Sequence, residues 1–245
     1  MSSLAYTRFE LLRTFRNRRF FIFSLGFPLV LFFLLAGPNR NEHNLASSGL
    51  PAPLYYMVGL ASFGTMSAVL SSGARIAGER SVGWNRQLRL TPLSVRSYFR
   101  AKILTAYATA LASIVVLYAA GTSLGVRLSA DRWISMTVLM LIALIPFAAL
   151  GILGGHLLTT DTIGPAMGGS TALFAFLGGT WFPISSHGAL HTIAECLPSF
   201  WLVRASHVAL GGSAWTRTGW VVIAVWTLVA AALAGWAYRR DTGRE

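Results

Sequence analysis

The side chains best placed for chemistry in this 245-residue sequence are two histidines, a glutamate and a cysteine. His187, His191 and Glu195 are spaced four residues apart, and Cys196 follows. On a helix the first three would share one face, and their side chains are of the types that bind zinc. Three such residues on a short helix without a fourth ligand are more typical of an interfacial helix with its polar face toward water. We therefore predict no metal site and assign these four residues no role.

The composition indicates that lipid surrounds most of the chain. Hydrophobic residues make up 54% of the sequence, charged residues make up 11%, and the mean hydropathy is +0.59. A soluble domain carries about a quarter charged residues. This chain therefore has too few charges to cover a surface that faces water, and its single cysteine excludes an intrachain disulfide.

Six stretches are long and apolar enough to cross a hydrocarbon core about 30 Å thick at about 1.5 Å per residue. We therefore predict an all-α fold, an integral membrane bundle of six transmembrane helices in a single transmembrane domain, residues 1–245. The predicted spans are Phe20–Gly37, Leu54–Gly73, Ile103–Gly125, Trp133–Leu158, Ile163–Phe182 and Trp220–Tyr238. The fifth is the weakest span, because it is rich in glycine and contains Pro165.

Positive charges give the orientation of these spans, since arginine and lysine prefer the cytoplasmic side. With the N-terminus inside, and an even number of spans, the C-terminus is also cytoplasmic. The net charge of +12 then reflects membrane topology, which argues against a nucleic-acid partner. We predict a multi-pass protein of the cell inner (plasma) membrane. Of the 20 Lys and Arg residues, those left outside are Arg40, Arg127, Arg132, Arg204 and Arg217.

Three segments lie outside the predicted spans. Residues 1–19 predict an amphipathic helix on the inner surface. Residues 78–102 are a cytoplasmic segment between spans two and three, and residues 183–219 are an outer interfacial segment with two short helical patterns broken at Pro198. The apolar residues near one face of the first helix are Leu4, Leu11, Leu12 and Phe15.

The groups that would supply energy for transport are missing from this sequence. All eight acidic residues lie outside the middle of the spans, which disfavours coupling to an ion gradient. The sequence also lacks a G-x-x-x-x-G-K-[ST] phosphate loop and so does not bind ATP in that way. We therefore predict no catalytic or cofactor-binding residue in this chain, and expect a partner to supply the energy.

The order of residues in the segment 78–102 is stricter than topology alone requires. Glu79-Arg80 follows span two, Gly83 permits a turn, and Trp84–Leu90 can form about two helical turns. Thr91-Pro92 ends that piece, because proline disfavours a helical conformation in the residue before it, and Ser94 is the predicted N-cap of span three. A force on this short helix would reach both neighbouring membrane helices. The alternative is an ordinary charged loop that only sets topology.

The same segment resembles a known family. "GERSVGWNRQLRLTPLSVRSYFRAKIL" is similar to the E-R-x-x-G…L-x-x-T-P-L segment of the permease subunits of ABC type-2 transporters. "GGTWFP" at Gly178–Pro183 and "LPSFW" at Leu197–Trp201 resemble the motif of that family before its last span. The order of elements also fits, so the resemblance covers essentially the whole chain.

The resemblance implies a permease that is driven by a separate ATPase subunit, which would hold the ATP and Mg²⁺. Two permeases, a second copy or a paralogue, would pair around the substrate path. The short helix near Gly83–Leu90 would dock on the ATPase, although Trp84-Asn85-Arg86 stands where family members often carry acids. The ATPase-coupling residues implied are Glu79, Arg80, Gly83, Arg86, Leu88, Leu90 and Pro92.

The substrate is expected to be a hydrophobic or amphipathic small molecule such as a drug or antibiotic, because the predicted spans carry almost no charge. Candidates for lining its path are Phe63, Met66, Phe174 and Phe176. Export of a lipid or lipid-linked polymer, a membrane-embedded enzyme and a scaffold protein remain alternatives. Two small-x-x-x-small patterns, Gly151/Gly155 and Gly164/Gly168, predict close helix packing.

The orientation can be tested by labelling single cysteines in intact cells. In a chain whose Cys196 is replaced by serine, Ser81→Cys should react with a membrane-permeant thiol reagent and not with an impermeant one, because the charge asymmetry places residues 78–102 inside. Asn44→Cys, between spans one and two, is the control and should react with both. Labelling of Ser81→Cys from outside would contradict the predicted topology.

Overall fold

The computed structural model describes residues 3–17, 22–45, 48–83, 94–184, 188–211 and 214–242, and every regular element in these ranges is a helix. The elements, in chain order, are α1 (Ser3–Phe15), the π-helical turn η1 (Ile22–Gly26), α3 (Phe27–Ala36), α4 (Ala52–Leu70), α5 (Ser72–Ser81), α7 (Val95–Ser123), α8 (Ala130–Ala143), α9 (Ile145–Leu157), α10 (Thr160–Leu177), α11 (Ala189–Glu195), α12 (Pro198–Arg204), the 3₁₀ helix η3 (Ala205–Leu210) and α13 (Arg217–Thr242).

Among the described residues, four helices are long and apolar enough to cross a membrane. They are Ala52–Ser81, Arg96–Ser123, Ala130–Leu157 and Arg217–Arg240, and they correspond to the second, third, fourth and sixth predicted spans. In place of the first predicted span there is a shorter apolar helix, Ser24–Ala36. The 18-residue α10, in place of the fifth, is not among the four. Length and composition therefore support four candidate spans within the described residues, and the six-span count is not confirmed.

Prolines mark where several of these helices begin. Pro28, Pro146 and Pro198 each lie in the first two positions of their helices, α3, α9 and α12. A proline is tolerated there because its missing N–H would have no partner inside the helix anyway. The predicted break at Pro198 is confirmed, since α11 ends at Glu195 and α12 begins at Pro198.

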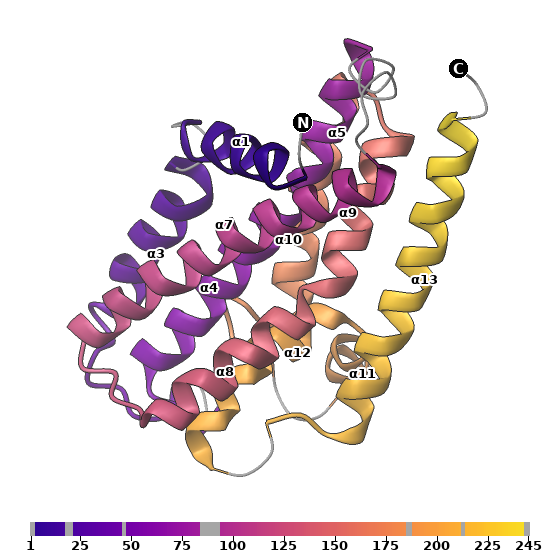
Figure 1. Ribbon diagram of the computed structural model, residues 1–245. Coiled ribbons are helices and arrows are strands. Elements are labelled where there is room, and N and C mark those ends of the chain that lie inside the picture. Colours follow the sequence, from indigo (N-terminus) through magenta and orange to yellow (C-terminus); the bar gives the residue numbers. More distant parts are fainter. Residues whose placement is uncertain are drawn as a thin grey trace.

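Helix α4 is the centre of the bundle. In the span that contains it, 83% of the most apolar window is buried inside the protein, against 22% for the span of α13. It packs against α3, α7, α9, α10 and α12, and Figure 1 shows α7 crossing in front of it. Because α4 is apolar on nearly all sides, it is suited to an interior position, whereas α13 lies at the edge of the bundle.

Glycines allow α9 to approach α4 and α5 closely. A Cβ atom on Gly73 would lie 2.1 Å from the backbone oxygen of Gly151, and one on Gly155 would lie 2.8 Å from that of Gly73. The packing predicted for Gly151 and Gly155 is therefore confirmed. The same prediction for Gly164 and Gly168 is wrong within the described chain, because no atom lies within 4 Å of a Cβ built on either residue.

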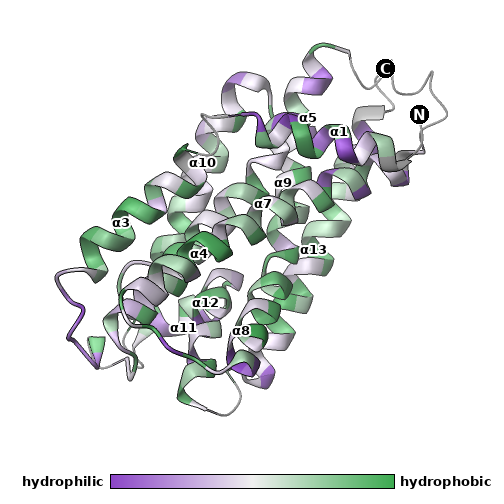
Figure 2. Cartoon of the chain, turned by 60° about the vertical axis from the view of Figure 1, so that its left-hand side comes forward, coloured by the Kyte–Doolittle hydropathy of each residue, from purple (hydrophilic) through white to green (hydrophobic). Residues whose placement is uncertain are grey.

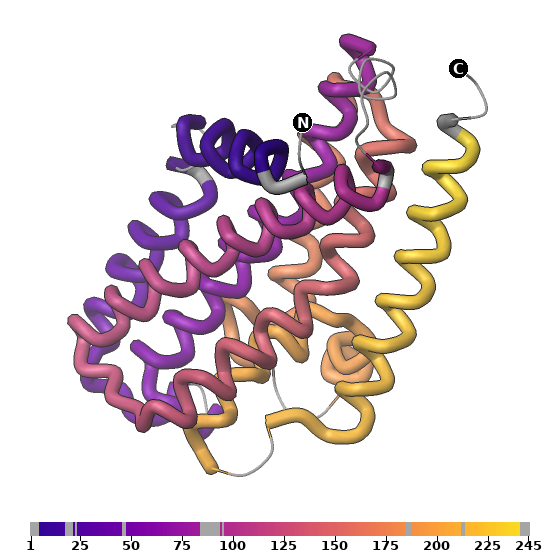
Figure 3. The backbone as a smooth tube through the Cα atoms, in the orientation of Figure 1, coloured from indigo at the N-terminus to yellow at the C-terminus, as the bar shows by residue number. Residues whose placement is uncertain are grey.

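The bundle has two ends of different character. Helix α1 lies across one end, where α5 and α13 finish and α7 begins (Figure 1); both termini of the backbone tube are at this end (Figure 3). We refer to it as the α1 end, and to the opposite end, which carries α11 and α12, as the α12 end. Hydrophobic colouring runs along α3, α4 and α13, and hydrophilic colouring gathers at α1 and in the connections (Figure 2).

The glycine contact predicts a stability difference between two matched substitutions. Gly73→Ala should lower the free energy of unfolding by about 1–3 kcal/mol, because the new methyl group would collide with backbone that cannot move aside. Gly235→Ala in α13, where the new methyl group would have no atom within 4 Å, should be neutral or stabilising by about 0.5–1 kcal/mol. Thermal unfolding of the purified variants in detergent measures both. Equal stability of the two variants would contradict the contact.

Candidate functional site

The structure describes both borders of the segment in which the coupling residues were predicted. Gly83 has a φ of 68°, so it adopts the left-handed conformation that glycine tolerates best, and its N–H donates to the carbonyl of Arg80 over 3.0 Å as α5 ends. At the other border the hydroxyl of Ser94 accepts a hydrogen bond of 3.2 Å from the N–H of Ser97. The turn at Gly83 and the N-cap at Ser94 are both confirmed. Four predicted coupling residues lie outside the described residues: Arg86, Leu88, Leu90 and Pro92.

Glu79 is buried inside the protein, with 3% of its surface exposed. Its Oε2 accepts a hydrogen bond of 2.7 Å from the hydroxyl of Tyr98. Its Oε1 accepts from the ammonium of Lys102 and, over 3.2 Å, from the guanidinium of Arg13. A carboxylate with this many donors is compensated for the loss of water.

Lys102 joins the two buried carboxylates of this network. It is 1% exposed, and its Nζ donates to Glu79 and, over 3.0 Å, to Oε2 of Glu10, which is also 1% exposed. Its ammonium also lies 5.2 Å from the centre of the Tyr98 ring. Burying a lysine between two glutamates is tolerable because each charge keeps a hydrogen-bonded partner, and removing one partner would leave an uncompensated charge.

Helix α1 contributes its polar face to this network. Tyr6, Glu10 and Thr14 follow one another at intervals of four residues, so they share one face, and all three are buried. The Thr14 hydroxyl donates to the carbonyl of Glu10 over 2.9 Å and accepts from the guanidinium of Arg75 in α5. The apolar side chains of Phe9, Leu12 and Phe15 are about half exposed, at 50%, 54% and 48%. The polar face of α1 therefore contacts the protein, and its apolar side chains point outward.

Arg80 ties the same segment to a different helix. Its guanidinium donates to the carbonyls of Gly155 over 2.9 Å and of Leu158 over 3.4 Å. These carbonyls belong to the last turn of α9, where backbone oxygens have no partner inside the helix and the helix dipole is negative. The adjacent residues Glu79 and Arg80 thus attach the end of α5 to different helices. Glu79 binds side chains of α1 and α7, and Arg80 binds the end of α9.

We call the side chains of Glu10, Arg13, Glu79, Tyr98 and Lys102 the charge network. They bring together α1 and the two helices that flank residues 84–93, namely α5 and α7. Because the contacts are short and buried, a displacement of either flanking helix would have to move the others or break an ion pair. The arrangement is suited to transmitting movement between helices.

Sequence reasoning identified Glu79 but missed Glu10, Tyr98 and Lys102. One signal was available, since Lys102 is the only lysine among the 20 Lys and Arg residues. A lysine forms a compact charge that can be placed between two carboxylates. A second signal was the interval of four that aligns Tyr6, Glu10 and Thr14. Neither signal identifies the partner, because α1 is far from α5 and α7 in the sequence and Glu79 and Lys102 are 23 residues apart.

The two other motifs that suggested a family meet at the α12 end. A Cβ on Gly178 would lie 2.6 Å from the hydroxyl of Ser199, so "GGTWFP" packs directly on "LPSFW". The Tyr55 hydroxyl donates to the carbonyl of Gly179, and the indole N–H of Trp201 donates to the carbonyl of Glu195 over 2.9 Å. These contacts join the end of α10 to the start of α4 and to α12.

The four residues predicted to line a substrate path have different environments. Met66 is fully buried in the core. Phe63 packs between the rings of Phe27 and Trp181, and Phe174 contacts those of Phe147 and Trp226. Phe176, on α10, is 59% exposed, and the partly buried Phe174 lines a pocket of about 270 Å³.

The histidines and the cysteine do not form a cluster in the described residues. His191 and Glu195 lie on α11, with 3.4 Å between Nε2 and Oε1, and Cys196 is exposed. His187 lies outside the described residues. The part of the chain that the structure describes contains no group of three His, Cys, Asp or Glu side chains that could hold a metal ion.

Comparisons with known proteins agree with these motifs. The model of the ABC-2 family of transporter proteins matches residues 39–238. A protein of Bacillus subtilis (strain 168) that carries the name "Putative transport permease YvfS" is 28% identical over 201 residues, which cover 78% of each chain. The family match includes the charge-network residues of α5 and α7.

The charge network predicts a specific order of stabilities. Lys102→Met should destabilise the protein by about 3–5 kcal/mol, because it leaves two buried carboxylates short of a cation. Arg100→Met, which removes an exposed charge two residues away, should change stability by less than about 1 kcal/mol. Membrane abundance and thermal unfolding in detergent would measure both effects.

A double variant shows whether Lys102→Met destabilises the protein through its unbalanced carboxylates or through lost packing. In Glu10→Gln/Lys102→Met a carboxylate and its cation are removed together, while Glu79 keeps Arg13 and Tyr98. This variant should be more stable than Lys102→Met alone. If it is less stable, or if Lys102→Met is no worse than Arg100→Met, the ion pairs do not carry the stability assigned to them.

Proposed function

Because the chain belongs to the ABC-2 family of transporter proteins, we propose that it is the membrane-spanning permease subunit of an ATP-driven exporter. A separate ATPase subunit binds ATP and Mg²⁺ and hydrolyses the ATP, and this chain forms part of the path across the plasma membrane. The observation that carries the proposal is the charge network, which connects both helices beside residues 84–93 to α1.

In this proposal the ATPase docks on residues 84–93. Glu79 and Arg80 serve as positioning residues rather than as docking contacts, because Glu79 is buried and Arg80 is occupied by the carbonyls of α9. A push on the docked segment reaches α5 through its direct connection and α7 through Ser94. Lys102 and Arg80 then distribute the movement to α1 and α9. The helices thus move as a connected group and open or close the path.

The α1 end is proposed to face the cytoplasm. Arginines are concentrated in the sequence that forms this end, as the positive-inside rule requires. Helix α1 then lies on the inner leaflet, supported by its buried polar face and by the outward Phe9, Leu12 and Phe15. Helices α3 and α10 run along the bundle between its ends (Figure 1), so they would complete six crossings and leave both termini inside.

A second permease, identical or paralogous, is proposed to cover the exposed face of α10. Gly164, Gly168 and Gly169 have open space where a Cβ would point, and Leu173 and Phe176 are 59% exposed on the same helix. Small residues allow two helices to approach closely in a membrane. A path between two such faces would have apolar walls, which suits a hydrophobic or amphipathic small molecule such as a drug or antibiotic.

The proposal predicts that coupling depends on apolar contacts in the docking segment. The purified chain should not hydrolyse ATP, whereas reconstitution with its ATPase should give hydrolysis that substrate stimulates. Leu88→Asp should abolish co-purification with the ATPase and transport, because a fully covered leucine contributes roughly 1.5–3 kcal/mol to binding. Arg86→Gln should be milder, since exposed ion pairs are usually worth about 1 kcal/mol or less.

Membrane abundance controls for misfolding, and both variants should insert like the unchanged chain because the segment lies outside the lipid. Pro92→Ala should also impair transport, by letting the short helix continue toward α7. Normal co-purification and transport in Leu88→Asp would make residues 84–93 an ordinary charged loop. ATP hydrolysis by the purified chain alone would refute the assignment of the energy source to a partner.

A further inference from the structure

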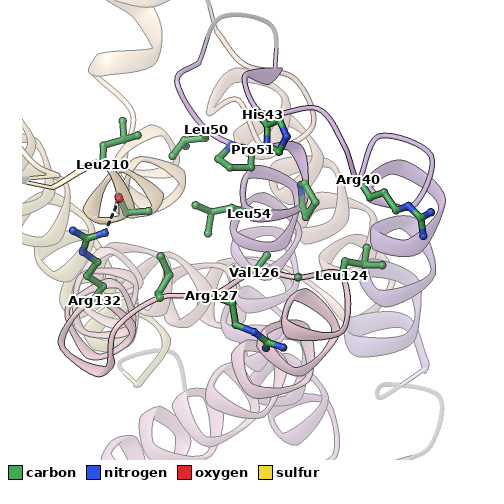
Figure 4. A pocket seen from close by; sticks show the side chains of 14 residues that line it. Arg40, His43, Leu50, Pro51, Leu54, Leu124, Val126, Arg127, Arg132 and Leu210 are labelled. Atoms are coloured by element: carbon green, nitrogen blue, oxygen red, sulfur yellow. Dashed lines mark hydrogen bonds between the residues drawn. The ribbon is translucent and has the colours of Figure 1, made fainter.

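A pocket at the α12 end combines apolar walls with positive charge. It has a volume of about 350 Å³, within the range of about 300–1,000 Å³ that is usual for ligand sites. The segment before α4, the α7–α8 connection, the start of α8 and the end of η3 enclose it (Figure 4). Its basic lining residues are Arg40, His43, Arg127 and Arg132.

The lining of the pocket contains no acidic side chain, although the charge of the exposed Asp131 acts on its neighbour Arg132. None of its 14 lining residues is Asp or Glu, and within the described ranges no ion pair joins Arg40, Arg127 or Arg132 to a carboxylate. The nearest acids in the sequence are the exposed Glu42 and Asp131, which do not line the pocket. Arg132 donates one hydrogen bond, of 3.1 Å, to the carbonyl of Ala209, and a guanidinium has five N–H donors.

The apolar part of the lining lies between the basic groups. Figure 4 shows Leu50 and Leu54 between Arg132 on one side and Arg40 on the other, with Arg127 at the edge near Val126. Leu50 and Leu54 are buried beneath the pocket, whereas Leu210 is 52% exposed and Leu124 and Leu128 are partly exposed. Arg40 and Arg127 are also exposed. A small free anion would make no apolar contact with the leucines, and an uncharged apolar ligand would accept no hydrogen bond from the arginines. The lining therefore matches an amphiphile with a negatively charged head.

The arginines of the α12 end are concentrated at this pocket. The sequence places five arginines at the α12 end, where the positive-inside rule disfavours them. Arg204 packs over the rings of Phe200 and Trp201, 5.6 Å from each ring centre, and Arg217 is exposed at the start of α13. The other three line this one pocket.

We propose that this pocket binds the anionic headgroup of a membrane phospholipid, with the glycerol and the first part of an acyl chain against Leu124, Leu128 and Leu210, the leucines of the lining that keep accessible surface. A phosphodiester accepts hydrogen bonds from guanidinium groups in the geometry that arginine provides. The α12 end is also a membrane boundary in this fold, so lipid is always available there. The site would anchor the α3–α4 and α7–α8 connections to one leaflet. It does not depend on coupling to an ATPase.

The test measures binding of short-chain phosphatidylglycerol, short-chain phosphatidylcholine and inorganic phosphate to the purified full chain in detergent. The unchanged chain should prefer phosphatidylglycerol to phosphatidylcholine. Arg40→Gln/Arg127→Gln should bind phosphatidylglycerol at least about tenfold more weakly, since each arginine near a lipid surface is worth about fivefold. Arg132 is left in place because its hydrogen bond to the carbonyl of Ala209, of 3.1 Å, is shorter than the bond of 3.5 Å from Arg127 to the carbonyl of Thr122.

The matched control is Arg96→Gln/Arg217→Gln, which removes the same charge from exposed positions outside the pocket and should bind phosphatidylglycerol like the unchanged chain. Unfolding temperatures check that both variants are folded; if the first is not, Arg127→Gln alone should show about a fivefold loss. Equal affinity for the two lipids, or an equal loss in both double variants, would overturn the proposal. Inorganic phosphate that competes at the concentration of the lipid would make the pocket a free-anion site and would equally overturn it.

Discussion

The buried ion pair between Glu79 and Lys102 is the constraint around which the α1 end is arranged. Two full charges are held at 3% and 1% exposure, and the cost of removing them from water requires that every neighbour supply a donor or an opposite charge. Glu10, Arg13 and Tyr98 meet that requirement. The consequence is that a surface helix, α1, is fixed to two membrane helices by polar contacts whose geometry permits little sliding.

The rest of the bundle is held by a different kind of contact. Along α4 and α9 the packing depends on glycines that bring backbone within contact distance, such as Gly73 against Gly151. At the α12 end, polar side-chain atoms meet backbone carbonyls, as in the bond of 2.8 Å from the Trp215 indole to the carbonyl of Trp201. Dispersion and hydrogen bonding must hold these regions, because lipid provides little hydrophobic force between helices. Ion pairs therefore hold one end of the molecule, and close packing holds the rest of it.

The same contrast separates the two basic regions. At the α1 end, Lys102 and Arg13 are balanced by the buried carboxylates of Glu10 and Glu79. At the α12 end, Arg40, Arg127 and Arg132 line a pocket without an acid in its lining, and the lipid headgroup that we propose there would supply the counter-charge. Residue type alone would not distinguish these roles, since arginine occurs in both. The distinction lies in whether a carboxylate from another helix reaches the charge.

Helical class, membrane character and family could be derived from the sequence, because composition and the local order of residues carry that information. Local signals at Gly83, Ser94 and Pro198 were also sufficient, since turns, caps and helix starts depend on neighbours in the chain. The six-span count was not confirmed, because four helices among the described residues are long and apolar enough to cross a membrane. Gly164 and Gly168 make no close helix contact within the described chain. The pairing of Lys102 with Glu10 and Glu79 was decided only by the tertiary structure. Their sequence separations of 92 and 23 residues leave no local signal, and a buried charge is stable only where folding brings its counter-charges to it.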